Sequence, residues 1–394
     1  MKKILIFSLV YYPRHVGGAE VAVKEITDRI SPSDFSFDMV TLAKHDSRFE
    51  KIGNVNVYRV GLIWLNKTKI FGKFYKYLFP FTSFIKASLL HRKNNYDAVF
   101  AVMANYAGFG ALFFKIFHPK VKLILNLQEG DPIPYIEKRV GIMKPLFNRI
   151  FRKADKIQAI SSYLAKWAET KGVKHPVAVV PNGVDGNRFK IKDLSFKREE
   201  EKEKMGFSKD DILVITTSRL VKKNAVGDII SAMKFLPENV KLIIAGGGHL
   251  ETELKLKVES LKLENRVKFT GYISHEELPK YLWISDVFAR PSLSEGMGVS
   301  FVEAMSAGVP VVATRVGGIP DFLQDKKTGL FCGIGDPKDL AKKIEIYLRD
   351  INLRNEIIEN ARKMVEEKYD WDLIARDMKN KVFNDALGIS SFPA

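Results

Sequence analysis

The sequence predicts an α/β protein with two domains, each built on a parallel sheet. Short apolar runs alternate with amphipathic segments along most of the chain, which is typical of strand–helix–strand units. The length of 394 residues suits two domains. A polar stretch at 190–210, rich in both charges, divides the alternation into two series, and we expect a linker and a solvated helix there.

The first series begins with a short apolar run behind a positive start, which is similar to a signal peptide. No small-residue cleavage site follows, so we interpret the run as a buried strand. Several segments are continuously apolar or β-branched, as parallel strands buried on both faces should be. The expected strands are 4–10, 37–43, 55–60, 98–103, 122–127, 156–161 and 177–182. Segment 20–30, between the first two, predicts a helix.

The second series has the spacing of another Rossmann-like sheet. Its expected strands are 212–220, 240–248, 266–273, 286–292 and 309–314. The amphipathic segment 369–387 predicts a helix that either caps the second domain or crosses back to the first. We therefore expect domains at 1–190 and 191–370, followed by a C-terminal helix within 371–394.

Composition and charge narrow the function classes. With 46% hydrophobic and 28% charged residues the chain is globular, and its single cysteine, Cys332, excludes an internal disulfide and fits the cytoplasm. The net charge of +17 lies in residues 1–190, which hold 31 basic and 14 acidic residues. This asymmetry predicts a polyanionic partner: nucleic acid, anionic lipid or a phosphorylated substrate. No nucleic-acid-binding module accompanies the charge, and no uncharged run reaches the roughly 18 apolar residues of a spanning helix.

Two glycine turns follow expected strands. In VGGAE (16–20), Gly17 and Gly18 precede a helix whose N-terminus suits an anion, although an ordinary strand–helix turn explains two glycines equally well. The spacing is not G-x-G-x-x-G, which disfavours a dinucleotide fold of the dehydrogenase kind. AGGGHLETEL (245–254) is a second such turn, either structural or facing a phosphate.

A charged loop, TSRLVKKNA (217–225), ends the first strand of the second domain, where open α/β sheets bind ligands. The planar fork of Arg219 and the ammonium groups of Lys222 and Lys223 suit a diphosphate. A solvated loop without a ligand is the alternative interpretation.

The stretch SEGMGVSFVEAM (294–305) ties two carboxylates to a glycine loop. If a helix begins near Gly298 and ends near Gly308, Glu295 lies in the loop before it and Glu303 within its first two turns. Both acids are then able to face one ligand at the helix N-terminus. A surface acid beside an acid near a helix start is the alternative.

These motifs together resemble retaining glycosyltransferases of family 4, also called glycosyl transferases group 1. PSLSEGMGVSFVEAMSAGVPVVAT is similar to the signature of that family. The other motifs follow in the family's order over nearly the whole chain: GGAE (17–20), VVPNGVD (179–185), SRLVKKN (218–224), VKFTGYI (267–273), GGIPD (317–321) and TGL (328–330). The resemblance implies the GT-B architecture, in which two Rossmann-like domains with parallel sheets face across a cleft.

The resemblance also implies a site for a UDP- or GDP-linked sugar. Glu295 would contact the sugar hydroxyls, Glu303 the ribose, and Arg219 the diphosphate. The donor-binding set it implies is Gly17, Gly18, Arg219, Lys223, Asn224, Tyr272, Ile273, Glu295, Gly296, Met297, Gly298, Val299 and Glu303. Within this set the glycine pair would approach from the other domain and the backbone at 272–273 would meet the base, while the helix near Trp371 would cross back.

Two positions depart from the family. Asn224 stands where a lysine is usual, so either Lys223 reaches the phosphates or one cation is missing. Gln128 stands where a histidine is common and would still hydrogen-bond a sugar hydroxyl. The catalytic candidates are Glu295, Arg219, Gln128 and Glu129, and the acceptor candidates are Glu129, Asp131 and Tyr106.

The expected mechanism is a front-face transfer with retention, in which the leaving phosphate accepts the acceptor's proton. Cations and helix N-termini would stabilise the leaving diphosphate without a metal or a cofactor. A double displacement would need a carboxylate nucleophile near C1, and the family places the one candidate, Glu295, on hydroxyls.

The acceptor is expected on the basic first domain. Segments 64–93 and 142–156 interleave lysine with bulky apolar residues, which suits an anionic lipid surface, although core helices with a solvated basic face are the alternative. We expect a glycan or lipid-linked acceptor, no nucleic acid, and a cytoplasmic protein that is peripheral on the inner face of the membrane. A nucleotide-sugar epimerase, a phosphorylase and a non-catalytic sugar-binding protein remain alternatives.

Overall fold

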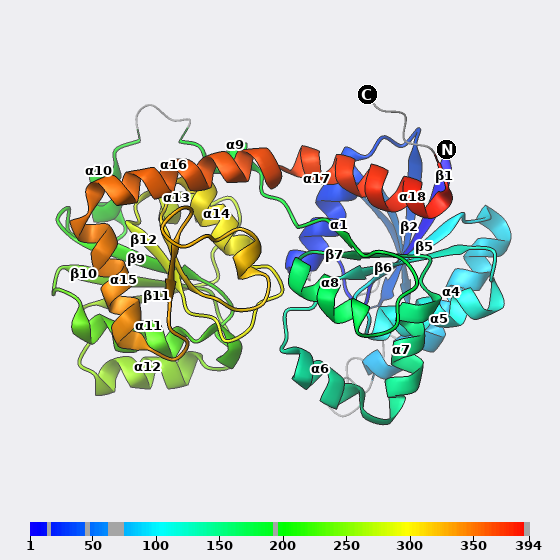
Figure 1. Cartoon of the computed structure of the whole chain (residues 1–394), viewed down its shortest axis with the longest axis horizontal. Coiled ribbons are helices and arrows are strands. Elements are labelled where there is room, and N and C mark those ends of the chain that lie inside the picture. Colours follow the sequence, from blue (N-terminus) through cyan, green and yellow to red (C-terminus); the bar gives the residue numbers. More distant parts are fainter. Residues whose placement is uncertain (14–16, 44–47, 62–74, 192–195, 390–394) are drawn as a thin grey trace. The chain divides into compact units, whose positions relative to one another are not determined.

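The computed structural model describes residues 1–13, 17–43, 48–61, 75–191 and 196–389. Residue 16 of VGGAE, residues 64–74 of the first basic segment and residues 192–195 of the expected linker lie outside this part. The chain divides into two compact units, Met1–Gly183 with Trp371–Ala394 and Val184–Asp370 (Figure 1).

Unit 1 is built on a sheet in the order β3-β4-β2-β1-β5-β6-β7-β8, with helices on its faces (Figure 1). Its strands are β1 (Lys2–Phe7), β2 (Phe35–Leu42), β3 (Phe49–Ile52), β4 (Val55–Val60), β5 (Ala98–Val102), β6 (Lys122–Leu127), β7 (Lys156–Ala159) and β8 (Ala178–Val179). All seven expected strands form and pair in parallel. The short β3 was not expected, and it pairs antiparallel with β4.

The helices of unit 1 include α4 and α5, which pack side by side. The helices of unit 1 in the described part of the chain are α1 (Gly18–Arg29), η1 (Tyr75–Leu78), α4 (Phe79–Asn94), α5 (Tyr106–Phe117), α6 (Ile133–Val140), η2 (Gly141–Met143), α7 (Lys144–Lys153), α8 (Ser162–Glu169), α17 (Trp371–Asp377), η6 (Met378–Asn384) and α18 (Asp385–Leu387). A single helix was expected over 369–387. The segment is helical from Trp371 to Leu387, but its middle part, η6, has π-helical hydrogen bonds between the α-helical α17 and α18.

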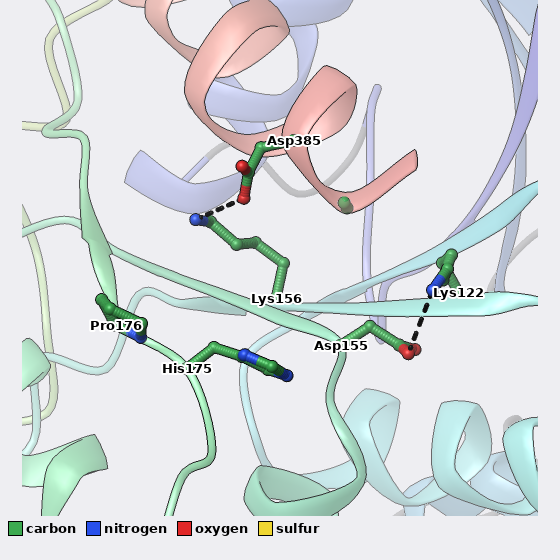
Figure 2. A pocket seen from close by; sticks show the side chains of 7 residues that line it. Lys122, Asp155, Lys156, His175, Pro176 and Asp385 are labelled. Atoms are coloured by element: carbon green, nitrogen blue, oxygen red, sulfur yellow. Dashed lines mark ion pairs between the residues drawn. The ribbon is translucent and has the colours of Figure 1, made fainter. Parts of the chain in front are cut away.

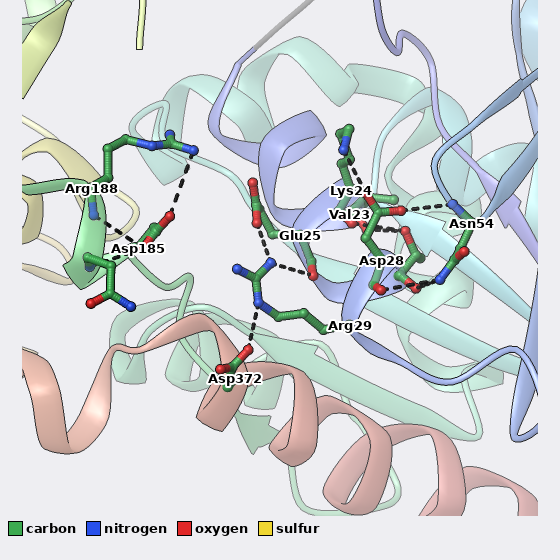
Figure 3. Close-up of polar contacts among 11 residues, drawn as sticks. Val23, Lys24, Glu25, Asp28, Arg29, Asn54, Asp185, Arg188 and Asp372 are labelled. Carbon is green, nitrogen blue, oxygen red and sulfur yellow. Dashed lines mark hydrogen bonds and ion pairs between the residues drawn. The ribbon is translucent and has the colours of Figure 1, made fainter. Parts of the chain in front are cut away.

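The C-terminal segment is a core element of unit 1. Trp371, Met378 and Phe383 are buried in the same cluster as the apolar residues of β1, β2 and β5. Arg29 of α1 adds a polar connection, since its Nε donates to the Asp372 carboxylate at 2.9 Å and its Nη1 to Glu25 (Figure 3). Apolar burial therefore holds this segment on the sheet that begins the chain.

Unit 2 is a wholly parallel sheet in the order β11-β10-β9-β12-β13-β14. Its strands are β9 (Ile212–Thr217), β10 (Val240–Ala245), β11 (Val267–Gly271), β12 (Val287–Arg290), β13 (Val311–Thr314) and β14 (Leu330–Cys332). The five expected strands form, and β14, within and after the TGL motif, is an addition. Two doubly wound α/β units confirm the predicted fold class.

Helices cover both faces of this second sheet (Figure 1). They are α9 (Gly186–Phe189), α10 (Arg198–Lys204), η3 (Lys222–Asn224), α11 (Val226–Ala232), η4 (Met233–Phe235), α12 (Glu251–Ser260), α13 (Leu278–Trp283), α14 (Val299–Ala307), η5 (Ile319–Asp321), α15 (Pro337–Arg349) and α16 (Ile351–Lys368). Among the described residues, no helix in either unit has the length and apolarity to cross a bilayer.

Candidate active site

The candidate donor site lies at the carboxyl edge of the sheet in unit 2. Parallel strands all end at one edge, so the loops after β9, β10, β12 and β13 gather there. Backbone hydrogen bonds join these loops directly: the Leu293 N–H donates to the Lys223 carbonyl at 2.7 Å, and the Gly318 N–H to the Glu295 carbonyl at 3.2 Å. The motifs SRLVKKN, PSLSEG and GGIPD therefore form one connected surface.

The AGGGH turn supports this surface with its backbone. A Cβ at Gly246 would lie 2.0 Å from the Ser218 carbonyl oxygen, and one at Gly248 would lie 2.4 Å from the Leu220 carbonyl oxygen. The Leu220 N–H also donates to the Gly247 carbonyl at 2.9 Å. These glycines let the turn pack against the charged loop, which gives them a structural role.

Helix α14 has the bounds expected from the sequence. It runs from Val299 to Ala307, between Gly298 with φ +96° and Gly308 with φ +79°. Glu295 lies in the loop before the helix and Glu303 in its second turn, as the sequence predicts. The first-turn N–H groups of α14 accordingly point to the same edge of the sheet as the loop.

Glu295 forms an ion pair with a buried arginine at the end of β12. The Arg290 Nη2 lies 2.7 Å from the Glu295 Oε2, and the other carboxylate oxygen accepts the Gly296 N–H at 3.2 Å. The Glu295 side chain remains 13% exposed. One edge of the carboxylate is thus fixed inside the protein while the group still reaches the surface.

Glu303 lies in a different electrostatic setting. Burial raises the pKa of its carboxyl, and the nearby basic side chains of His275, Arg188 and Arg290 oppose that rise. The Nδ1 atom of His275 is 4.0 Å from the Glu303 Oε1. Arg290 therefore pairs directly with Glu295 and acts on Glu303 only through its charge, while His275 is the closer partner of Glu303.

Gly317 packs against the backbone of the Glu295 loop. It has φ +54°, and a Cβ there would lie 1.8 Å from the Glu295 carbonyl oxygen. We expect Gly317→Ala to lower the free energy of unfolding by about 2 kcal/mol and to displace Glu295, because both the strain and the clash must be relieved. Chemical denaturation measures the first effect.

Gly335→Ala is the matched control for that experiment. Gly335 also has a positive φ, +66°, but no atom lies within 4 Å of its Cβ position. It should show only the cost of backbone strain, about 1 kcal/mol, and leave donor binding unchanged. Equal losses of stability and donor affinity in the two variants would contradict the role assigned to Gly317.

The charged loop explains one departure from the family pattern. Asn224 is buried, and its Nδ2 donates to the Arg219 carbonyl at 2.7 Å. Arg219 and Lys222 are exposed. The amide at 224 thus braces the loop backbone in place of adding a charge, and Arg219 keeps an open side chain.

The remaining donor-binding candidates lie in different surroundings. Tyr272 is 76% exposed at the end of β11, next to Ile273. In unit 1, the Gly17 N–H at the start of α1 donates to the Glu20 carboxylate at 2.9 Å. That carboxylate already caps the helix, so an anion would have to displace it before binding the Gly17 N–H; contact of Gly17 and Gly18 with a donor stays a prediction.

On unit 1, Gln128 is paired rather than open. Its Oε1 accepts the Asn182 Nδ2 at 2.8 Å, and its Nε2 donates to the Asn182 Oδ1 at 3.1 Å. Both ends of the amide are therefore occupied by a residue of the VVPNGVD segment. The amide keeps one further N–H and one further oxygen lone pair, so a hydrogen bond from Gln128 to a sugar stays a prediction.

Glu129 is a buried carboxyl at the end of β6. Its Oε1 accepts the Ala104 N–H at 2.7 Å, and burial raises its pKa to about 7 although that hydrogen bond opposes the rise. Its Oε2 is also buried, without a hydrogen-bond partner. The hydrogen bond to Ala104 fixes the loop that leads into Tyr106. The Tyr106 hydroxyl accepts a hydrogen bond from the Arg139 Nη2 at 2.9 Å.

The acceptor candidates Glu129 and Tyr106 are thus brought near one loop of unit 1, and Asp131 follows Glu129 by two residues. Sequence reasoning missed Arg290, Asn182 and Glu20, the partners of three candidates. One signal was available: Arg290 is a charge inside an otherwise apolar strand, and a buried charge needs a partner.

A separate pocket of about 430 Å³ lies at the opposite, amino edge of the unit 1 sheet (Figure 2). It is lined by Lys122, Asp155, Lys156, His175, Pro176, Asp385 and Ala386. Lys156 pairs with Asp385 at 2.7 Å and Lys122 with Asp155 at 3.7 Å, so these charges connect β6, β7 and α18. The pocket is distinct from the candidate site.

Two family models match the chain in succession. Residues 16–188 match the model described as glycosyltransferase family 4, and residues 197–364 match the model described as glycosyl transferases group 1. Each model covers most of one unit.

Relatives cover different shares of the chain. An uncharacterised glycosyltransferase of Methanocaldococcus jannaschii is 26% identical over 96% of this chain and 97% of its own length. The GDP-mannose-dependent α-(1-6)-phosphatidylinositol monomannoside mannosyltransferase of Mycobacterium tuberculosis is 28% identical over 62% of this chain and 66% of its own.

Solved structures share the fold. Anabaena HepE in complex with UDP and glucose has a TM-score of 0.77 at 21% identity, covering 98% of this chain and all of its own. Sucrose-phosphate synthase of Thermosynechococcus elongatus has a TM-score of 0.84 at 20% identity, covering 99% of this chain and 100% of its own. With the two family models in this order and two doubly wound units, the chain is a glycosyltransferase with the GT-B fold.

Proposed function

We propose that this enzyme transfers a hexose, with retention, from a UDP- or GDP-linked sugar to a hydroxyl of a glycan or lipid-linked acceptor. The observation that carries the proposal is the connected surface in unit 2: a backbone hydrogen bond joins the Arg219 loop to the Glu295 loop, and Arg290 joins Glu295 to Ser300 at the start of α14. A cation, a carboxylate and a helix N-terminus are the groups that a diphosphate and a sugar need.

The proposed chemistry is a front-face displacement. The donor C1–O bond breaks, the nucleoside diphosphate leaves, and the acceptor oxygen attacks C1 from the same face. The departing phosphate oxygen takes the acceptor's proton, so the products are a glycoside and a nucleoside diphosphate. Arg219 and the α14 N–H groups stabilise the developing charge, and the step uses neither a metal nor a cofactor.

A thermal-shift panel tests the donor site. We expect UDP with UDP-glucose, or GDP with GDP-mannose, to raise the melting temperature, because a ligand at 100 times its Kd adds about 2.7 kcal/mol. HepE binds UDP and glucose and the mycobacterial relative is GDP-mannose-dependent, which supports testing both bases. ADP-glucose completes the panel. No shift with any nucleotide would overturn the donor site, and an epimerised sugar or a sugar phosphate as product would overturn transfer.

Exposed apolar side chains on unit 1 support a membrane-proximal acceptor. Along α4, Phe81, Ile85 and Leu89 recur every four residues and so share one face. The α4–α5 ridge consists of Phe81, Ile85, Leu89, Ile116 and Phe117, all exposed. Basic residues Arg92, Lys93 and Lys120 are exposed nearby in sequence. Apolar side chains beside cations suit an anionic bilayer surface, so peripheral binding at the inner face of the membrane is part of the proposal.

Ile85→Glu tests this ridge. We expect the variant to bind phosphatidylglycerol-containing vesicles about tenfold more weakly in co-sedimentation, because it loses about 1.5–3 kcal/mol of apolar burial and adds a repelled charge. Leu256→Glu on α12 is the control, since Leu256 is 59% exposed and Ile85 57%. Vesicle binding that is equal in both variants, or insensitive to salt and to anionic lipid, would refute the membrane surface.

A further inference from the structure

Arg290 is a charged side chain that the proposed chemistry leaves unused. It ends strand β12 and is buried, and its side chain is 6% exposed. The guanidinium lies over the Phe301 ring, 4.2 Å from the centroid, and its buried Nε has no hydrogen-bond partner among the residues that the structure describes. Burying a cation is costly unless specific partners offset the cost, so its partners indicate its role.

The two terminal nitrogens of Arg290 reach three parts of the candidate site. Nη2 pairs with the Glu295 Oε2 at 2.7 Å. Nη1 donates to the Ser300 Oγ at 2.7 Å, in the first turn of α14, and to the Thr217 carbonyl at 3.2 Å, at the end of β9. The fork therefore joins the glutamate loop, the helix N-terminus and the strand that leads into the Arg219 loop.

We propose that Arg290 is a positioning residue that fixes the Glu295 carboxylate for the sugar of the donor. The proposal rests on the donor site proposed above. Arg290 occupies Oε2 from inside the protein, which leaves the partly exposed Glu295 to direct its remaining lone pairs outward. Ser300 and Thr217 hold Nη1, so the rigid guanidinium fixes the place of Nη2 and, through it, the Oε2 atom, which a flexible lysine does not do.

Positioning predicts an effect on the sugar and not on the nucleotide. The probes are UDP with UDP-glucose and GDP with GDP-mannose, and the pair that binds the wild-type enzyme is used. Titration calorimetry gives the affinity gained from the sugar as a ratio, the Kd of the nucleotide divided by the Kd of the nucleotide sugar. Arg290→Met should reduce this ratio by at least about tenfold. Affinity for the nucleotide alone should change less than about threefold. Arg290→Lys should recover part of the lost ratio, because one donor remains.

Arg266→Met is the matched control. Arg266 is also buried, but it donates to the carbonyls of Leu236, Pro237 and Val240 at the amino edge of the same sheet and pairs with the exposed Glu238 at 3.4 Å. This variant should lose stability and keep the ratio unchanged. If it lowers the ratio as much as Arg290→Met does, general destabilisation explains the result and the proposal is overturned.

A double-mutant cycle with Glu295→Gln separates positioning from independent binding. If Arg290 acts through Glu295, Arg290→Met should lower the ratio further by less than about twofold when Glu295 is already glutamine. Additive losses, or an unchanged ratio in folded Arg290→Met, would overturn the proposal. If Arg290→Met does not fold, Arg290→Lys in the same cycle gives the same two outcomes. Failure of the donor site itself is distinct, because the wild-type enzyme would then bind neither probe.

Discussion

Replacement of Arg219 by methionine is expected to lower kcat/KM for the nucleotide sugar by about 10²- to 10³-fold. The side chain is exposed at the end of β9, and Asn224 holds its carbonyl at 2.7 Å, so the loop should keep its shape without the guanidinium. Negative charge increases on the diphosphate as the C1–O bond breaks. The loss should therefore appear mainly in kcat, since a transition-state interaction is removed.

Steady-state kinetics with Arg219→Met, Arg219→Lys and Arg349→Met test this expectation. Arg349 on α15 is the control, because its side chain is 78% exposed and pairs with Glu345 one turn earlier on the same helix. Lysine at 219 should recover part of the loss by restoring charge without the fork. A decrease in kcat no larger than that of Arg349→Met would remove Arg219 from the chemistry.

Glu129→Gln is expected to stabilise the protein by about 3 kcal/mol above pH 7 and to have little effect below pH 5. Burial raises the pKa of Glu129 to about 7, while the unfolded chain ionises near the ordinary value of 4.5. The folded state thus holds the proton more tightly, and this group's contribution is lost as pH rises from about 4.5 to about 7. Glutamine keeps an oxygen for the Ala104 N–H and never ionises.

Chemical denaturation at pH 5 and pH 8 measures the difference. Glu137→Gln is a control with the opposite sign, because its hydrogen bond with Lys171 lowers the pKa of the Glu137 carboxyl. That variant should be less stable than the wild type at both pH 8 and pH 5, and the difference should disappear only as pH falls through the lowered pKa, where the wild type loses its ion pair. The same pH dependence in wild type and Glu129→Gln would show that Glu129 does not carry the proton.

The sequence predicted the strands well because several of them, such as β5 and β10, are nearly continuous apolar runs and others, such as β4, alternate apolar and polar residues. It did not predict β3 or β14, because FEKI is half polar and LFC is three residues long. It placed strand ends too late at β9 and β10, where the ligand-side loops continue the apolar or glycine pattern. The π-helical η6 also has no signal in amphipathic spacing.

Within the site, the sequence predicted which loops matter but not which side chains hold one another. Gln128 and Asn182 are 54 residues apart, and Arg290 meets the Thr217 carbonyl across 73 residues. Such pairs depend on how separate strands end at one edge of a sheet, and local patterns do not contain that information. The roles of Gly17, Gly18, Tyr272 and Ile273 stay predictions.

The close backbone contacts at Gly246, Gly248 and Gly317 have a consequence for evolution. A Cβ at any of these three glycines would clash with a backbone carbonyl oxygen, so the shapes of the Arg219 and Glu295 loops depend on main-chain contacts. Substitutions of exposed side chains elsewhere on these loops leave those contacts intact. Tyr272, by contrast, projects into solvent from the same edge. In the proposed donor site the backbone at 272–273 meets the base, so we predict that substitutions of Tyr272 change the preference for the nucleobase without rebuilding the loops, and directed evolution of donor choice should begin there.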